Sequence, residues 1–425
     1  MRDVLVAGTI FLVIPFVLAR PYIGVYLWTW ISLMSPHRLA YGFAYSFPFA
    51  VVTAVAIFLG MMFSKEKKKI PWTRETVLLV VLFLWMVLTT VVAIHQDSAW
   101  AQLNKVSKIQ LMILVTLILI DTQKKLHYLA WAIVVSLGFY GLKGGVFTIL
   151  HGGAYHVQGP ADSFIGGNNE VALALVMTIP LMRYLQLYEK NKWVRYGLAA
   201  WMLITVISAV GSQSRGALLA LAAMGALIWL KGRKKLVTAV LLLVSVGMVV
   251  TIMPQSWFDR MGTIRSYEQD GSALGRINSW HFAYNLALSR PFTGGGFESF
   301  TRDLFLVYAP EPENVHDAHS IYFEMLGEHG FVGLGLYLLI WLLTWRTASK
   351  LSKQANKDPD TKWMADLLGM VQASMIGFAV GGAFLGLSYF DLYYLLIAFV
   401  IISKRIASEK LKVSSEKNGE TILLR

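Results

Sequence analysis

Long apolar runs, separated by short clusters of lysine and arginine, most restrict what this chain can fold into. The runs hold roughly 17–25 residues each, the length at which a helix crosses the ~30 Å hydrocarbon core of a bilayer. Within lipid only helices and closed barrels satisfy their backbone groups, and the runs lack the alternation of barrel strands. Hydrophobic residues make up 56% of the 425 residues and charged residues 15%. The sequence therefore predicts an all-α, polytopic transmembrane helix bundle of about twelve helices.

The basic clusters indicate which loops face the cytoplasm. A net charge of +13 also suits nucleic-acid binding, but the positive residues here lie in short stretches between apolar runs. That pattern follows the positive-inside rule, so we expect membrane topology and no nucleic-acid partner. The expected cytoplasmic clusters are 65–69, 124–125, 190–195, 231–235, 346–362 and 404 onward.

Each interval between these clusters has room for two spans. The expected spans are 77–94, 109–120, 128–149, 169–187, 197–212, 216–230, 236–253, about 320–345, 364–387 and 390–403. At the N-terminus we expect 4–19, as a retained helix and not a cleaved signal peptide, and 43–63. The run 22–34 is short and is expected to be re-entrant or interfacial, or to be part of a neighbouring helix. This gives twelve helices with both chain ends in the cytoplasm; thirteen is the alternative.

The domain organisation follows from these spans. We expect N-terminal transmembrane helices over 1–253, a large non-cytoplasmic loop with short amphipathic helices over 254–318, C-terminal transmembrane helices over 319–406, and a solvated cytoplasmic tail over 407–425. The large loop contains arginine but no lysine, which runs against the topology bias and indicates another role. Its arginines are Arg260, Arg265, Arg276, Arg290 and Arg302. The chain has no cysteine, which excludes disulfides, thiol catalysis and thiolate metal sites.

Arg215 is the first candidate for anion binding. It follows Ser212, Gln213 and Ser214 in a tight non-cytoplasmic turn, close to a helix N-terminus. A guanidinium stays charged and matches phosphate oxygens, and the helix end adds backbone N–H groups and a favourable dipole. The alternative is an arginine that extends to the membrane surface from a helix end.

A second candidate region runs from Gly275 to Gly296. It predicts an amphipathic helix on the membrane that Pro291 ends. The apolar face would consist of Ile277, Trp280, Tyr284, Ala287 and Leu288. The triplet Gly294-Gly295-Gly296 allows close backbone approach to a ligand or a turn with positive φ, and a flexible connector is the alternative. Arg290, a cation beside exposed N–H groups, would complete an anion site.

The segment from His316 to His319 leads into a long apolar run. Asp317 is a good N-cap and would place His319 in the first helical turn, where the helix dipole disfavours imidazolium. A neutral histidine at a membrane surface can act as a general base. The alternatives are a histidine that only caps or hydrogen-bonds, and a metal held by His316, Asp317 and His319. Three ligands this close at a helix start match a metal site poorly, so no metal or other cofactor is expected.

Two further motifs need interpretation. Lys143, beside Gly144 in an apolar run, either extends outward or helps to hold an anionic substrate. Asp358-Pro359-Asp360 has the Asp-x-Asp spacing of nucleotide-sugar glycosyltransferases, but it lies in a lysine-rich cytoplasmic loop and is interpreted as a turn.

These motifs resemble the bacterial O-antigen ligase family and, within it, the O-glycosylation ligases associated with exosortase systems. The resemblance covers nearly the whole chain, with short motifs in a specific order. The matching stretches are Gly159-Pro160 through Asn168-Asn169-Glu170, Ser214-Arg215-Gly216-Ala217-Leu218-Leu219, Gly275-Arg276, Arg290-Pro291-Phe292-Thr293-Gly294-Gly295-Gly296, and Ala318-His319-Ser320 running to Glu328-His329-Gly330. Ser320 stands where many of these ligases carry asparagine, so the resemblance specifies the reaction more closely than it specifies the acceptor.

The resemblance implies a multi-pass enzyme of the bacterial inner membrane whose large periplasmic loop covers a lipid-exposed cavity. Such enzymes move a glycan from undecaprenyl diphosphate to an acceptor, without metal and with inversion. By this resemblance Arg215 and Arg290 hold the diphosphate and His319 is the catalytic base. We add Arg276 to the diphosphate site and place Asp317, His316 and Lys143 in support.

The expected function is therefore O-antigen ligation to the lipid A core in lipopolysaccharide synthesis. A diphosphate is already a good leaving group, so arginines that stabilise it and one base for the acceptor hydroxyl suffice. The same chemistry would serve a polysaccharide polymerase or a protein O-oligosaccharyltransferase. A transporter of lipid-linked sugars is a different class, which should show repeats or charges at mid-membrane. The sequence shows no clear repeat.

Overall fold

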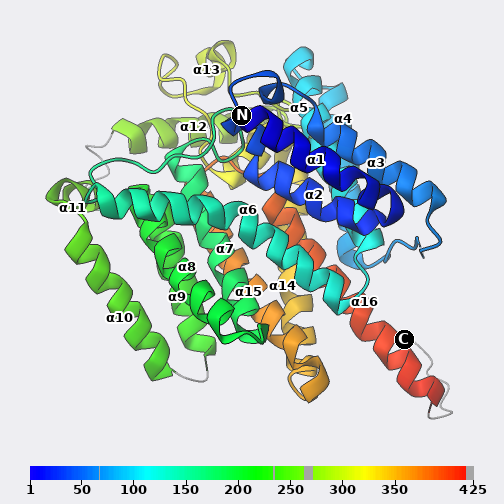
Figure 1. Ribbon diagram of the computed structural model, residues 1–425. Helices are drawn as coiled ribbons and strands as arrows, with labels where there is room; N and C mark the ends of the chain where they lie inside the picture. The colour runs from blue at the N-terminus through cyan, green and yellow to red at the C-terminus, as the bar shows by residue number, and fades with distance from the viewer. Residues whose placement is uncertain (67, 233–234, 263–270, 418–425) are drawn as a thin grey trace.

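The computed structural model describes residues 1–66, 68–232, 235–262 and 271–417, and within these ranges the chain is helical and has no strand (Figure 1). Eight helices are long and apolar enough to cross a membrane by length and composition, and α3 is a shorter apolar helix. The predicted polytopic helix bundle is confirmed. The α-helices are α1 (Arg2–Ala19), α2 (Pro21–Met34), α3 (Phe49–Phe63), α4 (Arg74–Val91), α5 (Gln96–Leu119), α6 (Gln123–Leu150), α7 (Asn168–Tyr188), α8 (Lys192–Gly211), α9 (Arg215–Lys231), α10 (Lys235–Ile252), α11 (Gln255–Gly262), α12 (Gly271–Ser289), α13 (Arg302–Tyr308), α14 (Ile321–Ala355), α15 (Lys362–Gly381) and α16 (Asp391–Lys417).

The segment 22–34 forms a complete helix, α2, which packs against α1, α3 and α6. In the described ranges α2 reverses the chain between α1 and α3. Its place in a membrane, and the choice between twelve and thirteen spans, stay predictions.

The two ends of the described chain lie at opposite faces of the bundle (Figure 1). At the N-terminal end, Asp3 Oδ1 accepts hydrogen bonds from the backbone of Gly42 (2.9 Å) and Ala44 (3.1 Å). Nearby Tyr45 bonds to Asp162 of the loop between α6 and α7. At the other face, Lys410 Nζ of α16 lies 3.4 Å from Asp358 Oδ2. The expectation that both ends lie on one side is wrong, because α2 adds one reversal.

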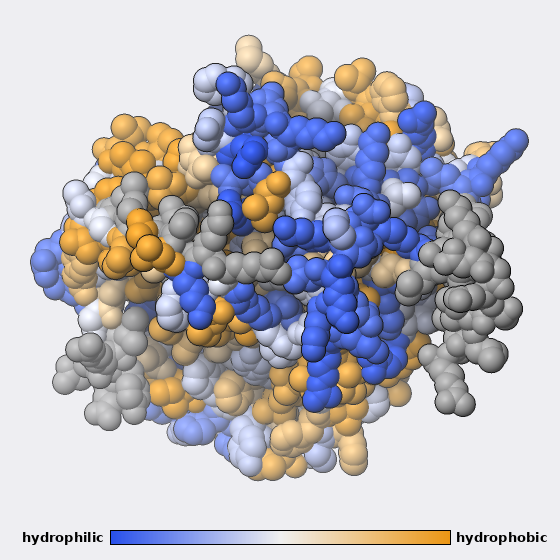
Figure 2. All heavy atoms as spheres, turned by 90° about the horizontal axis from the view of Figure 1, so that it is seen from below, coloured by the Kyte–Doolittle hydropathy of each residue, from blue (hydrophilic) through white to orange (hydrophobic). Residues whose placement is uncertain are grey.

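Hydrophilic residues gather over the middle of the face that carries the C-terminal end of the described chain, with hydrophobic residues around them (Figure 2). Several basic clusters meet here, as when Lys125 Nζ contacts Glu66 Oε2 at 3.3 Å. The motif Asp358-Pro359-Asp360 is a turn, as predicted, since Asp358 Oδ1 accepts from Asp360 N (3.0 Å). In the tail expected over 407–425, residues 407–417 continue α16, while 418–425 lie outside the described residues.

Small residues let α6 and α8 approach closely beneath the opposite face. A Cβ atom on Gly145 would lie 2.2 Å from the carbonyl oxygen of Ile204, and one on Gly211 would lie 2.0 Å from Thr148 Oγ1. Close backbone approach at glycine is the usual device for packing helices in lipid, where hydrophobic burial does not favour one contact over another. This packing fixes the outer end of α8, from which the turn to Arg215 begins.

The described part of 254–318 forms α11, α12 and α13 over the face opposite the C-terminal end (Figure 1). The helix predicted from residue 275 exists as α12. Of its expected membrane-facing side chains, Tyr284 and Leu288 are exposed and Ala287 is buried. The buried face carries Phe282 and packs on α13 and α14.

Candidate functional site

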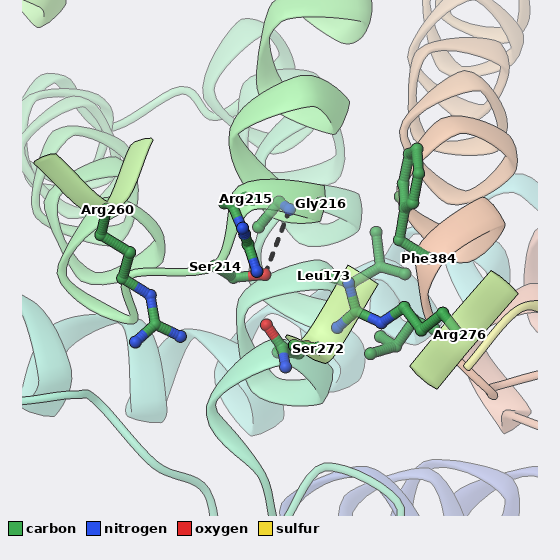
Figure 3. Close-up of a pocket in the computed structure, with 12 residues that line it drawn as sticks. Leu173, Ser214, Arg215, Gly216, Arg260, Ser272, Arg276 and Phe384 are labelled. Carbon is green, nitrogen blue, oxygen red and sulfur yellow. Dashed lines mark hydrogen bonds between the residues drawn. The ribbon is translucent and has the colours of Figure 1, made fainter. Parts of the chain in front are cut away.

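A pocket lined by three arginines lies where α7, α9, α11, α12 and the end of α15 meet. It has about 450 Å³ of empty space, part of it open to solvent. In Figure 3, Arg260 and Arg276 point into it from opposite sides, and Arg215 reaches it from the start of α9. The lining residues are Asn169, Leu173, Ser214, Arg215, Gly216, Ala217, Arg260, Ser272, Arg276, Gly381, Phe384 and Leu385. Among the residues that the structure describes, the lining carries three guanidinium groups and no carboxylate, which suits an anion with several oxygen atoms.

Arg215 is the first residue of α9, which confirms the predicted helix start. Ser214 is the N-cap, and its Oγ accepts from the backbone N of Ala217 at 3.3 Å. The positive end of α9 therefore adds to the guanidinium charge at the pocket.

Arg276 and Arg260 come from the large loop. Arg276 lies in the first half of α12. Arg260 lies in α11, which is anchored where Trp257 Nε1 donates to the carbonyl oxygen of Val210 (3.2 Å). Arg260 was not a predicted site residue, although the absence of lysine from this loop already distinguished its arginines. Arg265 lies outside the described residues.

Arg290 does not line the pocket. Its Nη2 donates to the carbonyl oxygen of Val92 at 2.5 Å. The glycines that follow also differ from expectation, because their N–H groups are not exposed to a ligand. Gly294 N donates to Arg290 O (2.9 Å), Gly295 N to Gly327 O (2.8 Å) and Gly296 N to Glu328 O (2.9 Å). Gly294 and Gly296 adopt positive φ, as one interpretation of the triplet expected; Gly294 allows a close approach to α14 and Gly296 a close approach to the end of α4. The expected exposed N–H groups are therefore not available to an anion, while the role of Arg290 stays a prediction.

His319 stands just before α14 and not in its first turn. The helix begins at Ile321 with Ser320 in the N-cap position, and His319 has a φ of 42°. Asp317 does not cap α14; its Oδ1 accepts from Ala318 N (3.0 Å). The predicted start of α14 lies a few residues too early in the sequence. His319, which is left-handed, separates Asp317 from the helix, and nothing in the local sequence indicates that conformation.

Helix α12 holds the segment that carries His319. Ser279 Oγ donates to the carbonyl oxygen of His316 (3.0 Å), and Trp280 Nε1 donates to that of Ala318 (3.0 Å). The ring of His316 lies over Gly275, where a Cβ atom would come within 2.6 Å. The same helix carries Arg276, so α12 brings the arginine pocket and His319 together.

The electrostatic surroundings of His319 favour its neutral form. Burial is the main cause that lowers the pKa of His319; the carboxylate of Asp317 opposes it, and the positive charge of Arg276 lowers the pKa further. The direction agrees with the neutral histidine expected from sequence, but burial and not the helix dipole is the main cause. A neutral, half-buried imidazole beside an anion pocket can accept a proton.

The remaining predicted residues lie apart from this pocket. Lys143 is exposed on α6 and is not in the lining. His316 and Asp317 are exposed beside His319, and the described residues contain no group of three or more His, Cys, Asp or Glu side chains that could hold a metal.

A buried polar cluster beneath the loop was not predicted. The ring of His329 lies between Thr89 Oγ1 (2.7 Å) and Tyr389 Oη (2.9 Å), and Tyr389 bonds to Glu328. Glu328 Oε1 in turn accepts from Glu298 N (2.7 Å). The cluster ties α4, α14 and the chain before α16 to the glycine turn. Its sequence signal was Glu328-His329-Gly330, within the resemblance.

The fold and the pocket define a class: a polytopic membrane protein with an arginine-lined pocket at one face. Residues 198–338 match the family model described as O-antigen ligase, and residues 1–190 match a family of unknown function (DUF5935). No curated protein matches the chain. The chain is therefore similar to the O-antigen ligase family over residues 198–338, which include Arg215, Arg276 and His319. The exosortase-associated subgroup stays a prediction.

Proposed function

We propose that the protein is an inner-membrane O-antigen ligase that transfers a glycan from undecaprenyl diphosphate to a hydroxyl of the lipid A core, with its site facing the periplasm. The family that residues 198–338 match comprises membrane glycosyltransferases of the O-antigen ligase and polymerase type. The observation that carries the proposal is the joining of the arginine pocket to His319 through α12. A diphosphate carries several charged oxygens, which three guanidinium groups can bind at once.

The residues suggest a single displacement without a metal. Arg215, Arg260 and Arg276 would hold the diphosphate and stabilise the charge that develops as it leaves. His319 would take the proton of the acceptor hydroxyl while the acceptor oxygen bonds to the anomeric carbon and the bond to the diphosphate oxygen breaks. One displacement inverts the anomeric carbon. Arg290 and Lys143, which lie outside the lining, would act at most on more distant parts of the substrates.

The orientation is part of the proposal. Hydrophilic residues gather on the face that carries the end of α16 (Figure 2), where Lys125 contacts Glu66 of the cluster 65–69, and the positive-inside rule assigns that face to the cytoplasm. The pocket and α11 to α13 would then face the periplasm, as expected for the large loop 254–318. Arg215 begins α9, and Arg260 and Arg276 lie in α11 and α12 of the large loop; none of these helices is among the eight candidate spans of the described residues, which favours an enzyme over a transporter.

The acceptor separates the proposed ligase from a polysaccharide polymerase or a protein O-oligosaccharyltransferase. The test is reconstitution of the purified protein with a glycan on undecaprenyl diphosphate and one of three acceptors: lipid A core, a second glycan donor or an acceptor protein. We expect lipid A core to gain the mass of the glycan. Mass gained only by the glycan or by the protein would contradict the ligase assignment. No transfer to any acceptor would contradict the proposed chemistry.

A further inference from the structure

The loop between α6 and α7 belongs to the region matched by the family of unknown function, yet it bonds directly to the turn before Arg215. Four hydrogen bonds cross between them: Val157 N to Gly211 O (3.3 Å), Asn168 Nδ2 to Ser212 O (2.9 Å), His156 Nε2 to Gln213 Oε1 (2.9 Å) and Gln213 Nε2 to Gly153 O (3.0 Å). The same region also supplies Asn169 and Leu173 to the lining of the arginine pocket.

Gln213 is the centre of this contact. Its side chain is buried, with 7% exposed, and its φ of 58° is unusual for a residue other than glycine. Both ends of its amide are engaged, the oxygen by His156 and the nitrogen by the carbonyl of Gly153. Only one orientation of the amide satisfies both bonds, because a flip would set its oxygen against another carbonyl oxygen. We call Gln213 with His156 and Gly153 the Gln213 clamp.

The Gln213 clamp holds the residues that orient the side chain of Arg215. Gln213 leads directly to Ser214, whose backbone N donates to Ser212 Oγ (3.2 Å) and whose own Oγ caps α9. Arg215 follows as the first residue of that helix. A change in the turn would therefore rotate the start of α9 and move the guanidinium relative to Arg260 and Arg276.

We propose that the Gln213 clamp positions Arg215 for the diphosphate, so that the N-terminal region of unknown function forms part of the donor site. The inference rests on the proposed function, since it takes the ligand of the arginine pocket to be a lipid diphosphate. His156 donates through Nε2 both as the neutral Nε2–H tautomer and as imidazolium, so the clamp holds in both states.

The test measures the affinity of the purified full-length protein for undecaprenyl diphosphate without a glycan. Gln213→Met keeps the size of the side chain and removes both bonds, while His156→Phe removes one bond from an exposed residue and should fold in any case. Misplacing a binding group can cost up to about a hundredfold, and we expect at least a tenfold loss of affinity for Gln213→Met. In an Arg215→Ala background neither variant should weaken binding further, because the clamp acts through Arg215.

Gln372→Met is the matched control. Gln372 is also buried and also bonded through both ends of its amide, to Lys231 Nζ (2.8 Å) and to Ser349 Oγ (2.7 Å), but it lies on α15 outside the pocket lining. Gln372→Met should lower the unfolding temperature without changing the affinity for undecaprenyl diphosphate. Equal affinity of the parent, Gln213→Met and His156→Phe would overturn the inference, as would losses that add to that of Arg215→Ala. A parent that does not bind undecaprenyl diphosphate would instead refute the proposed function, and the inference with it.

Discussion

The indole Nε1 of Trp280 donates a hydrogen bond to the carbonyl oxygen of Ala318, 3.0 Å away, and so joins the middle of α12 to the residue before His319. The Trp280 ring also stacks on Phe323 in the first turn of α14, with ring centroids 5.0 Å apart. Trp280 therefore fixes the chain on both sides of His319, while Arg276 lies one turn earlier on the same helix. A single helix sets the distance between the proposed base and the pocket.

Trp280→Phe should keep the ring contact with Phe323 and lose the bond to Ala318. We expect kcat for glycan transfer to fall about tenfold because His319 is less well placed, while affinity for undecaprenyl diphosphate stays near that of the parent. The matched control is Trp85→Phe, which removes a similar bond from an indole to a carbonyl, that of His329 (3.1 Å), away from the pocket. Equal loss of kcat in both variants would show that Trp280 acts only through stability.

Each arginine of the pocket should contribute to donor binding. Arg215→Ala, Arg276→Ala and Arg260→Ala should each raise the dissociation constant for undecaprenyl diphosphate about tenfold or more, since a charged hydrogen bond contributes about 1.5–3 kcal/mol. Lysine in place of each arginine should recover only part of the affinity for undecaprenyl diphosphate, because a point charge cannot reproduce two parallel hydrogen bonds. Arg302→Ala is the control: Arg302 pairs with Glu313 (2.7 Å) on the exposed surface, and its loss should leave binding unchanged.

Arg260 shows which part of the site could be predicted from the sequence and which part could not. Arg215, Arg276 and His319 were identified from residue type, order and the resemblance; the structure places both arginines on one pocket, and His319 within electrostatic reach of Arg276. Arg260 was counted only among the arginines of the loop, because nothing local indicates that α11 folds back onto the start of α9. The tie is the bond from Trp257 to Val210, which joins residues far apart in sequence.

The helices themselves were largely predictable because apolar runs determine them. The errors lie where tertiary contacts override a local pattern. The triplet 294–296 resembled an anion-binding turn, but Gly294 N bonds to Arg290 O, and the N–H groups of Gly295 and Gly296 bond to α14. The start of α14 was predicted too early because His319 before it is left-handed. A short run such as 22–34 becomes a full helix because α1, α3 and α6 surround it.

Gly330 interrupts α14 and should not tolerate a side chain. Its φ is 66°, and a Cβ atom would lie 2.4 Å from the carbonyl oxygen of Phe292. Gly330→Ala should lower the free energy of unfolding by about 1–3 kcal/mol. Gly335→Ala, later in α14 and with open space around the added atom, should be neutral or raise it by about 0.5–1 kcal/mol. Thermal unfolding in detergent measures both, and equal effects would exclude strain at Gly330 as the cause.

Topology can be tested with single cysteines, since the chain has none. Tyr41→Cys lies on the face of the pocket, and Asp360→Cys lies on the face of the C-terminal end; both positions are exposed. In intact cells an impermeant thiol reagent should label Tyr41→Cys and leave Asp360→Cys unlabelled until the membrane is opened. The reverse pattern would place the arginine pocket in the cytoplasm and contradict the proposed orientation.

His319 is the proposed general base, and its removal should abolish transfer while donor binding persists. Loss of a general base typically costs about 10²–10⁴ in rate, whereas the arginines still hold the diphosphate in His319→Ala. His316→Ala and His329→Ala should be milder if one base acts alone. If instead His316, Asp317 and His319 held a metal, all three would matter about equally and a chelator would stop the reaction.

The pH dependence of kcat tests the role of His319 separately from the roles of its neighbours. A base acts when unprotonated, so kcat should rise with pH through the pKa of His319, which burial lowers below its ordinary value of 6.5. Because the carboxylate of Asp317 raises that pKa, Asp317→Asn should lower it and move the acidic limb of the profile to lower pH. His316→Ala should move the limb to higher pH, because His316 lowers the pKa of His319. Profiles of kcat for the parent and the two variants measure these shifts. A limb that moves in neither variant would mean that another group accepts the proton.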